Sequence, residues 1–424
     1  MQTVLSEEFI GTAEGEKAKE VIANCVHCGF CNATCPTYQI LGDELDGPRG
    51  RIYLMKEMFE GKPVSEITQQ HLDRCLTCRA CETTCPSGVK YSELVDVGRR
   101  VMERKVERPL TERVKRWGLK EMVARPAVFS RAAAVGYTLK PLLPQSLKEL
   151  LPDRPAKGRA EPTRTHARIM LVLDGCVQPS LTPQTNSAAI RVLDALGITL
   201  KRVPRAGCCG AVRHHLNDLE GAKTDARRNI DAWWPFIQSD QAEAIVSTAS
   251  GCGVQLEHYA DLLADDPDYA EKAQKIAGLS LDISLILQNE LLAVDARTLP
   301  QTSSPLKIAV QEPCSFQHAL RNKASISALL TRFGHTPVPV RDGHLCCGSA
   351  GTYSVLQPEL SEQLRTNKIE ALQVSSPDMI VTANVGCYGH LAAKAPIPIK
   401  HWIEVVDDIF SESETGASLQ KLEA

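Results

Sequence analysis

Cysteines are the residues of this chain that are best suited to chemistry, and all sixteen of them fall into two repeated patterns. In the first pattern, the run Cys-x2-Cys-x2-Cys-x3-Cys-Pro occurs twice, and the second copy follows the first by fifty residues. The copies contain Cys25, Cys28, Cys31 and Cys35, then Cys75, Cys78, Cys81 and Cys85. Thiolate is the soft ligand that iron–sulfur clusters use, and this spacing is typical of chains that hold two clusters. The residues therefore predict electron transfer.

The spacing also predicts how the thiolates are shared between the clusters. The first three cysteines of such a run bind one cluster, and the fourth reaches the other. We therefore expect two [4Fe–4S] centres, one held by Cys25, Cys28, Cys31 and Cys85, the other by Cys75, Cys78, Cys81 and Cys35. Zinc is the alternative, because Cys-x2-Cys also occurs in zinc sites, but zinc requires neither the third cysteine nor the proline.

The remaining eight cysteines form the second pattern, a single cysteine, a Cys-Cys-Gly triplet and another single cysteine, which also occurs twice. The two copies are Cys176, Cys208, Cys209 and Cys252, then Cys314, Cys346, Cys347 and Cys387. Gly210 and Gly348 end the triplets, and glycine's freedom of φ would let backbone amides point at sulfur.

This second pattern resembles the cysteine-rich CCG domain of heterodisulfide reductase subunits and of lactate- and glycolate-oxidising complexes. By that resemblance, the five-cysteine form of the domain holds a non-cubane [4Fe–4S] cluster and ends in Cys-x2-Cys. In this chain Ala249 and Asn384 stand where the first cysteine of that final pair belongs. Each copy thus offers four thiolates, which leaves three alternatives: a further cluster, another metal such as zinc, or buried inert thiols.

The elements that position the first pattern are predicted to be helical. Thirty-nine residues separate Cys35 from Cys75, and apolar residues recur there at helical spacing in RIYLMKEMFEG. We expect an α-helical ferredoxin domain with a basic extension over residues 1–150. A Pro- and charge-rich linker from Pro152 to His166 follows.

After the linker, short apolar runs alternate with amphipathic helices, and the same order returns later in the chain. The first cysteine and the Cys-Cys pair recur after 138 residues, and the last cysteine after 135. This predicts a duplication into two α/β lobes with parallel sheets, at 167–296 and 306–410. Their ligands should gather beyond the carboxyl ends of the strands. The expected fold is therefore α+β and multidomain, with a flexible tail at 411–424.

Composition narrows the function further. The net charge of −3 gives no support for nucleic-acid binding. The acidic start has no apolar core of a signal peptide, and no segment approaches the roughly 18 apolar residues that span a bilayer. We expect a cytoplasmic protein. Residues 99–131 carry eleven Lys or Arg against four Glu. This basic segment is expected either to touch the inner face of the membrane or an acidic partner, or to connect the domains with its apolar stripe packed inward.

No glycine-rich dinucleotide motif follows a predicted strand, so the chain reads as a conduit without a site for hydride chemistry. Clusters pass single electrons, whereas oxidation of an alcohol removes two, and a flavin converts between the two regimes. We therefore expect FAD on a partner chain, and no catalytic residue on this one.

The whole chain resembles the iron–sulfur subunit of bacterial glycolate oxidase. The similar segments are GPRGRIYLMKEM, DGCVQPSLTPQTN, EPCSFQHAL, CCGSAGTYSVLQPELS and IPIKHWIEVV. The resemblance implies a non-catalytic subunit of an oxidoreductase that acts on CH–OH donors. FAD-containing partner subunits would oxidise glycolate to glyoxylate, and this chain would pass the electrons to a quinone or another acceptor. The alternatives are the same role for lactate or glycerol 3-phosphate, and an enzyme similar to heterodisulfide reductase.

Overall fold

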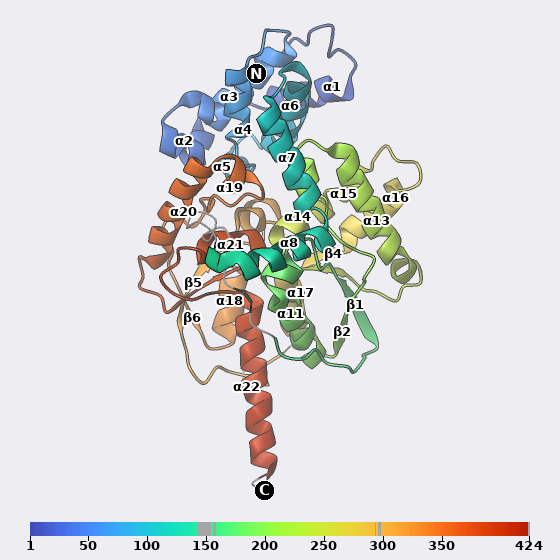
Figure 1. Cartoon of the computed structure of the whole chain (residues 1–424), viewed down its shortest axis with the longest axis vertical. Helices are drawn as coiled ribbons and strands as arrows, with labels where there is room; N and C mark the ends of the chain where they lie inside the picture. Colours follow the sequence, from blue (N-terminus) through green and yellow to red (C-terminus); the bar gives the residue numbers. More distant parts are fainter. Residues whose placement is uncertain (143–153, 156–157, 293, 296–297, 423–424) are drawn as a thin grey trace.

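The computed structural model describes residues 1–142, 154–155, 158–292, 294–295 and 298–422. Its amino-terminal part is helical, as predicted, and lies at one end of the molecule (Figure 1). The elements there are α1 (Ala13–Ala23), η1 (Phe30–Thr34), α2 (Pro36–Leu41), η2 (Glu44–Asp46), α3 (Pro48–Phe59), α4 (Glu66–Asp73), α5 (Ala80–Thr84) and α6 (Tyr91–Lys105). Proline starts α2 and α3, at the helical position where its missing amide costs no hydrogen bond.

An apolar core holds these helices together. Met55, Phe59 and Leu94 have no exposed surface. Gly98 of α6 lies so close to α3 that an added Cβ would be 2.4 Å from the sulfur of Met55. The direct contact between α3 and α6 fixes the segments that carry the two ferredoxin-like runs.

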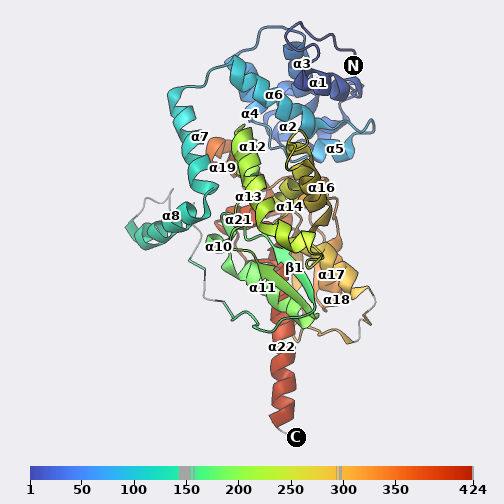
Figure 2. The same cartoon turned by 90° about the vertical axis from the view of Figure 1, so that its right-hand side faces the viewer.

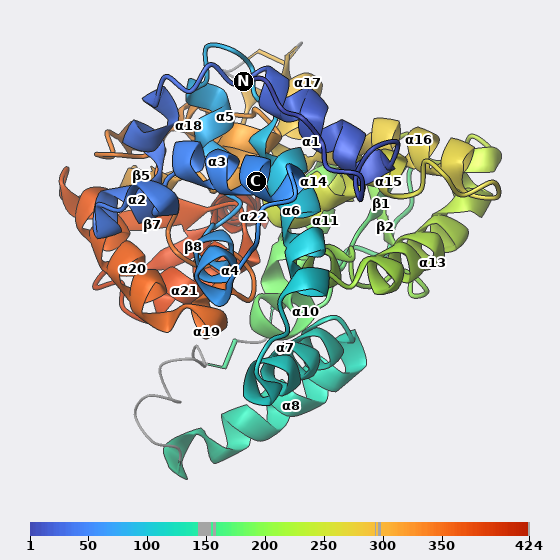
Figure 3. The ribbon, with the colours of Figure 1, turned by 90° about the horizontal axis from the view of Figure 1, so that it is seen from above.

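The basic segment continues as α7 (Leu110–Val123), α8 (Pro126–Leu139) and η3 (Lys140–Leu142), which form an arm beside the body of the molecule (Figures 2 and 3). Leu119 and the following Ala124 are buried, so one side of the arm packs inward. Leu110, Val114 and Trp117 are more than half exposed. These three recur at helical spacing, so the arm presents an apolar stripe outward.

Each of the two duplicated regions forms a four-stranded parallel sheet. The first consists of β1 (Arg168–Val172), β2 (Ile198–Arg202), β3 (Ile245–Ser247) and β4 (Ser280–Asp282), in the order β2-β1-β3-β4. The second consists of β5 (Lys307–Gln311), β6 (Thr336–Val338), β7 (Met379–Thr382) and β8 (Ile399–His401), in the order β6-β5-β7-β8. The shared order confirms the predicted duplication and the predicted fold class. The sequence pattern does not predict β4 and β8, because each of these three-residue strands contains a single apolar residue, Leu281 or Ile399, and so forms no apolar run.

Helices cover both faces of the first sheet. Met170 and Val172 of β1 point into one core, and Leu171 points into the other, as alternation along a strand requires. The helices of the first lobe are α10 (Gln178–Leu181), α11 (Pro183–Ala195), α12 (Ala211–His215), α13 (Leu219–Gln238), α14 (Ser250–Glu257), α15 (Tyr259–Leu262), α16 (Ala270–Leu279) and α17 (Ile283–Leu291). Those of the second are η5 (Ser315–Ala319), α18 (Ser325–Arg332), α19 (Tyr353–Leu356), α20 (Pro358–Gln373), α21 (Val385–Ala392) and α22 (Trp402–Leu422).

The two lobes share one apolar core. Leu193 of α11 belongs to the same buried cluster as Ile308 of β5 and Trp402 of α22. An ion pair of 2.6 Å between Arg191 and Asp407 joins α11 to α22. The two sheets are therefore parts of a single packed unit.

The carboxyl-terminal segment differs from the prediction. Residues 411–424 are expected to form a flexible tail, but the described residues continue α22 as far as Leu422. Ile403, Val406 and Ile409 bury the start of this helix in the core, and no proline follows to end it. Residues 423–424 and the predicted domain ends at 150 and 296 lie outside the described residues.

Replacing the buried Trp402 with alanine should destabilise both lobes together. Trp402 has no exposed surface and lies in the core that the lobes share. We expect the free energy of unfolding to fall by about 3–5 kcal/mol, measured by urea denaturation. Trp117→Ala, on the exposed stripe of α7, is the matched control and should change it by less than about 0.5 kcal/mol. If Trp402→Ala and Trp117→Ala lowered the free energy of unfolding equally, the shared core would be contradicted.

Candidate iron–sulfur sites

The two ferredoxin-like runs adopt the same backbone conformation. The second and fourth residues after the first cysteine have positive φ in both runs, 58° at His27 and 87° at Gly29, then 53° at Thr77 and 62° at Arg79. Left-handed residues curl each loop into a concave turn. The third cysteine then lies on η1 or α5, and the fourth directly precedes a proline.

The thiols of these runs line two adjoining cavities. The cysteines of cavity 1 are Cys25, Cys28, Cys31, Cys81 and Cys85. The cysteines of cavity 2 are Cys35, Cys75, Cys78 and Cys81. Each cavity contains the four thiols of one predicted set, including the fourth cysteine of the other run. Cys81 lines both cavities.

This set of donors fits iron–sulfur clusters. Every cysteine of the chain is a free thiol. Burial raises the pKa of Cys31 to about 11 and raises the pKa of Cys81 well above its usual value. Burial thus favours the protonated thiols, and binding of a metal centre would release their protons. The residues that line cavity 2 include no histidine, aspartate or glutamate. Its cysteines therefore supply soft sulfur donors, which favour an iron–sulfur cluster.

The two cavities differ in their surroundings. Cavity 1 reaches the surface, because the Cys28 thiol is exposed. Val26 and Phe30 beside it are 68% and 63% exposed. Cavity 2 instead lies on the side of the second lobe.

Cys78 of cavity 2 lies in the same apolar cluster as two thiols of the second lobe. Cys78, Cys314 and Cys346 belong to one apolar cluster, together with Leu76 and Tyr353. Burial, and next the neighbouring Cys314, raise the pKa of Cys78.

Two hydrogen bonds hold this junction. The Tyr353 hydroxyl donates to the Arg74 carbonyl at 3.1 Å, and the Thr83 hydroxyl lies 2.7 Å from His318 Nδ1. The junction is not predictable from the sequence, because the cysteine spacing does not indicate which lobe faces the helical domain.

The four cysteines of each Cys-Cys-Gly repeat come together beyond the strands, as predicted. In the second lobe, the sulfur atoms of Cys314 and Cys346 are 3.8 Å apart, and those of Cys347 and Cys387 are 3.4 Å apart. In the first lobe, hydrogen bonds link the thiols in the order Cys176, Cys208, Cys209, Cys252. A cluster and a zinc ion both use such a set of four thiolates.

The pKa of one thiol in each repeat is lowered. Hydrogen bonds from the neighbouring thiols Cys176 and Cys209 lower the pKa of Cys208. The pKa of Cys347 is lowered in the same way, by Cys346 and Cys387. Thiolate is the form that binds metals, so the lowered pKa favours the binding form of one thiol in each repeat.

Backbone amides point at sulfur in both repeats, as their glycines predict. The Gly210 amide donates to Cys208 Sγ at 3.4 Å, and the Gly348 amide donates to Cys346 Sγ at 3.5 Å. Both glycines have positive φ, 93° and 89°, which other residues rarely adopt.

The positions of the missing fifth cysteines lie beside these thiols. Ala249 and Asn384 directly precede α14 and α21, which carry Cys252 and Cys387. Asn384 Nδ2 donates to Cys387 Sγ at 3.6 Å. An amide therefore occupies the place of a thiol in the second lobe.

Comparison with known proteins identifies the family. Two family models match the chain, a 4Fe-4S dicluster domain at residues 21–89 and a cysteine-rich domain, CCG, at 170–257 and 308–392. The glycolate oxidase iron-sulfur subunit of Escherichia coli (strain K12) is 50% identical over 407 residues, which are 96% of this chain and 98% of that protein. This chain belongs to the family of glycolate oxidase iron–sulfur subunits.

Two more distant relatives are also similar to this chain. The probable glycolate oxidase iron-sulfur subunit of Bacillus subtilis (strain 168) is 30% identical and covers 86% of this chain and 87% of its own length. Lactate utilization protein A of an Exiguobacterium strain is 26% identical over 55% of this chain and 94% of its own length. The chain is accordingly an iron–sulfur component of an oxidoreductase, with a role in electron transfer. Across the residues that the structure describes, no helix has the length and apolar character needed to cross a membrane.

Proposed function

We propose that this chain carries electrons from FAD-containing glycolate oxidase subunits, which oxidise glycolate to glyoxylate, to a quinone or another acceptor. The observation that supports this most is a continuous line of thiol sites. Cavity 1 reaches the surface at Cys28, Cys81 lines both cavities, and Cys78 of cavity 2 packs against Cys314. Electrons would enter at cavity 1 and leave through cavity 2 toward the second lobe.

The cysteines would hold the clusters as follows. Cavity 1 would bind one [4Fe–4S] cluster through its four predicted thiolates, and cavity 2 would bind the other. When bound, the clusters supply one-electron carriers. The thiols of the two lobes would hold a further cluster or another metal. We propose no catalytic residue on this chain, because the partner's flavin would perform the two-electron step.

The alternative functions differ either in the substrate that donates the electrons or in the class of protein. The same relay would serve lactate or glycerol 3-phosphate if the partner subunits bound those substrates. A disulfide reductase similar to heterodisulfide reductase would require the special cluster, and Ala249 and Asn384 replace one of its ligands in each lobe.

Anaerobic co-purification with its flavin subunits tests the proposal. We expect about eight irons from the two ferredoxin-like sites, because each cubane holds four, and more iron if the lobes hold clusters. The complex should reduce a dye with glycolate and much more slowly with lactate. A preference for lactate would reassign the substrate. Reduction of a heterodisulfide by the isolated chain, with no flavin present, would overturn the relay.

We also propose a cytoplasmic location with peripheral contact to the inner face of the membrane, through the exposed stripe on α7. The full chain should co-sediment with vesicles that contain anionic lipid at low salt, and less so at high salt. Trp117→Ala should weaken this binding by about tenfold, because a loss of about 1.4 kcal/mol is tenfold. The exposed Val374→Ala is the control and should bind like the unmodified chain. Binding that ignores salt, or no binding, would remove the membrane from the proposal.

A further inference from the structure

A fully buried cation lies beside cavity 2. Arg51 of α3 is 1% exposed, and its Nη1 atom is 3.9 Å from Cys35 Sγ. Its other nitrogens donate to the Thr37 hydroxyl at 3.1 Å and to the His71 carbonyl at 2.7 Å. The Thr37 hydroxyl is in turn 3.3 Å from Cys35 Sγ. The guanidinium is thus fixed against one of the thiols that line the cavity.

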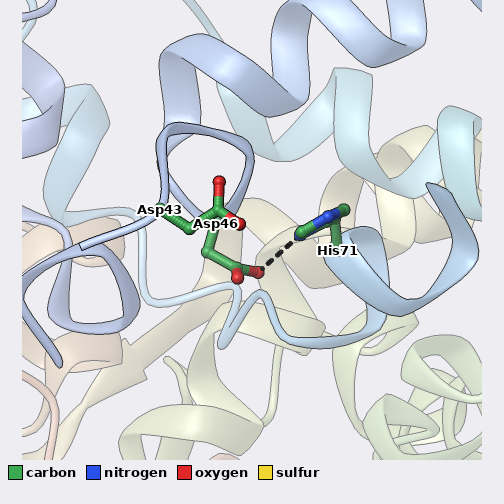
Figure 4. Close-up of side chains that lie close together, drawn as sticks. All are labelled: Asp43, Asp46 and His71. Atoms are coloured by element: carbon green, nitrogen blue, oxygen red, sulfur yellow. Dashed lines mark hydrogen bonds and ion pairs between the residues drawn. The ribbon is translucent and has the colours of Figure 1, made fainter. Parts of the chain in front are cut away.

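The carboxylate of Asp46 anchors this arrangement. Asp43, Asp46 and His71 lie close together, and in Figure 4 a dashed line joins the Asp46 carboxylate to His71. His71 Nδ1 is 3.0 Å from one Asp46 oxygen, and Arg74 donates to the other at 2.9 Å. Arg51 is 3.5 Å from the same carboxylate. Because nitrogen donors already occupy both oxygens, the group is better explained as support for Arg51 than as a metal site.

Cavity 1 has no comparable charge among its lining residues. Its arginine is Arg49, two residues earlier in the chain. The Arg49 side chain is 33% exposed and pairs with Glu44 at 2.6 Å. Water and the carboxylate together reduce its field at cavity 1.

The surroundings of cavity 2 are more positive. Arg51 and Arg74 face one carboxylate, that of Asp46. Arg99 adds another guanidinium, which donates to the Cys75 carbonyl at 2.6 Å. The Tyr91 hydroxyl also donates to Cys75 Sγ at 3.8 Å. Charges in a buried, low-dielectric site act more strongly than charges in water.

We propose that Arg51 raises the reduction potential of the cluster held in cavity 2 above that of the cluster in cavity 1. Reduction adds negative charge to a cluster, and a fixed positive charge beside it favours the reduced state. An electron that leaves cavity 1 is then retained next to Cys78, on the side of the second lobe. This inference rests on the proposed function for the direction of flow, but the potentials themselves do not depend on any substrate.

The test is a redox titration of the full chain, followed by EPR, with iron counted for every variant. The Cys28→Ser chain identifies the signal of cavity 1. Arg51→Gln should lower the ratio of electrons on the cavity 2 cluster to electrons on the cavity 1 cluster in half-reduced protein by about tenfold, which is about 59 mV for a one-electron couple. Asp46→Asn removes the opposing charge and should raise that ratio. Arg49→Gln is the matched control at cavity 1 and should leave the ratio unchanged.

A merely structural role for Arg51 would give different results. Unchanged potentials in Arg51→Gln with full iron, or shifts of the same sign in Arg51→Gln and Asp46→Asn, would overturn the proposal. If Arg51→Gln loses iron, the reduction potentials of Arg51→Lys and Asp46→Asn test the role of Arg51 instead. Lysine should keep the potential near that of the unmodified chain, and a potential that does not rise in Asp46→Asn would refute the role. The redox titration uses dithionite as the reductant and needs neither glycolate nor the flavin subunits. Failure of the glycolate assay would therefore contradict the proposed function without affecting the measured potentials.

Discussion

Replacing Cys78 with alanine is expected to stop glycolate-dependent dye reduction by the assembled complex while the flavin is still reduced. Cys78 lines cavity 2 and contacts the cluster of thiols in the second lobe. Its loss would remove a proposed cluster ligand at the point where the two domains meet. Mutation of a residue that only supports a metal ligand already lowers activity by up to about 100-fold. We therefore expect the rate of dye reduction to fall by more than about 100-fold.

Rapid-mixing absorbance separates the two steps of this reaction. Bleaching of the flavin by glycolate should proceed at the rate of the unmodified complex, because the proposed function assigns the flavin to the partner. Iron should fall by about four atoms per chain. Failure of flavin reduction as well would show that Cys78 is needed for assembly or for more than relay. Dye reduction at the normal rate would show that electrons bypass cavity 2.

Two equivalent cysteines in the duplicated lobes are expected to differ in importance. Cys314→Ser should slow dye reduction by about 10- to 100-fold, because Cys314 packs beside Cys78. Cys176→Ser should have a smaller effect. Cys176 and Cys208 pack with Ala124 at the end of α7, not with the cysteines of cavity 2.

Each of these variants serves as the control for the other, because they remove the same atom from the same position of the repeat. Steady-state dye reduction and iron content should be measured for both. Equal losses would place both lobes on the electron path. A larger loss for Cys176→Ser would indicate that electrons pass from cavity 2 to the first lobe and not to the second.

Local spacing was sufficient to predict much of this molecule. The crossing of Cys35 and Cys85 between the cavities follows from the run itself, since three residues of spacing and a proline carry the fourth thiol away from the first three. The duplicated sheets were predictable because each repeat shows the same alternation of strand and helix. Gly210 and Gly348 indicated amides that point at sulfur, because few other residues adopt their backbone conformation.

What the sequence could not show depends on contacts between distant segments. The contact of Cys78 with Cys314 joins residues from separate domains and leaves no periodic signal. Arg51 is one of two arginines in α3, and its burial against Cys35 distinguishes it from the other. The helical character of 411–422 was missed because a polar composition resembles a tail, whereas the apolar residues that start α22 precede it.

The junction at Cys78 also bears on how the duplicated lobes can diverge. Copying a domain yields two equivalent sets of cysteines, but only those of the second lobe share the buried cluster that contains Cys78. Under the proposed relay, substitutions of the second lobe's cysteines would interrupt electron transfer, whereas the first lobe meets no such constraint at this contact. Equivalent positions in the two copies would then be under unequal selection, and a change accepted in one lobe would give no guide to its cost in the other.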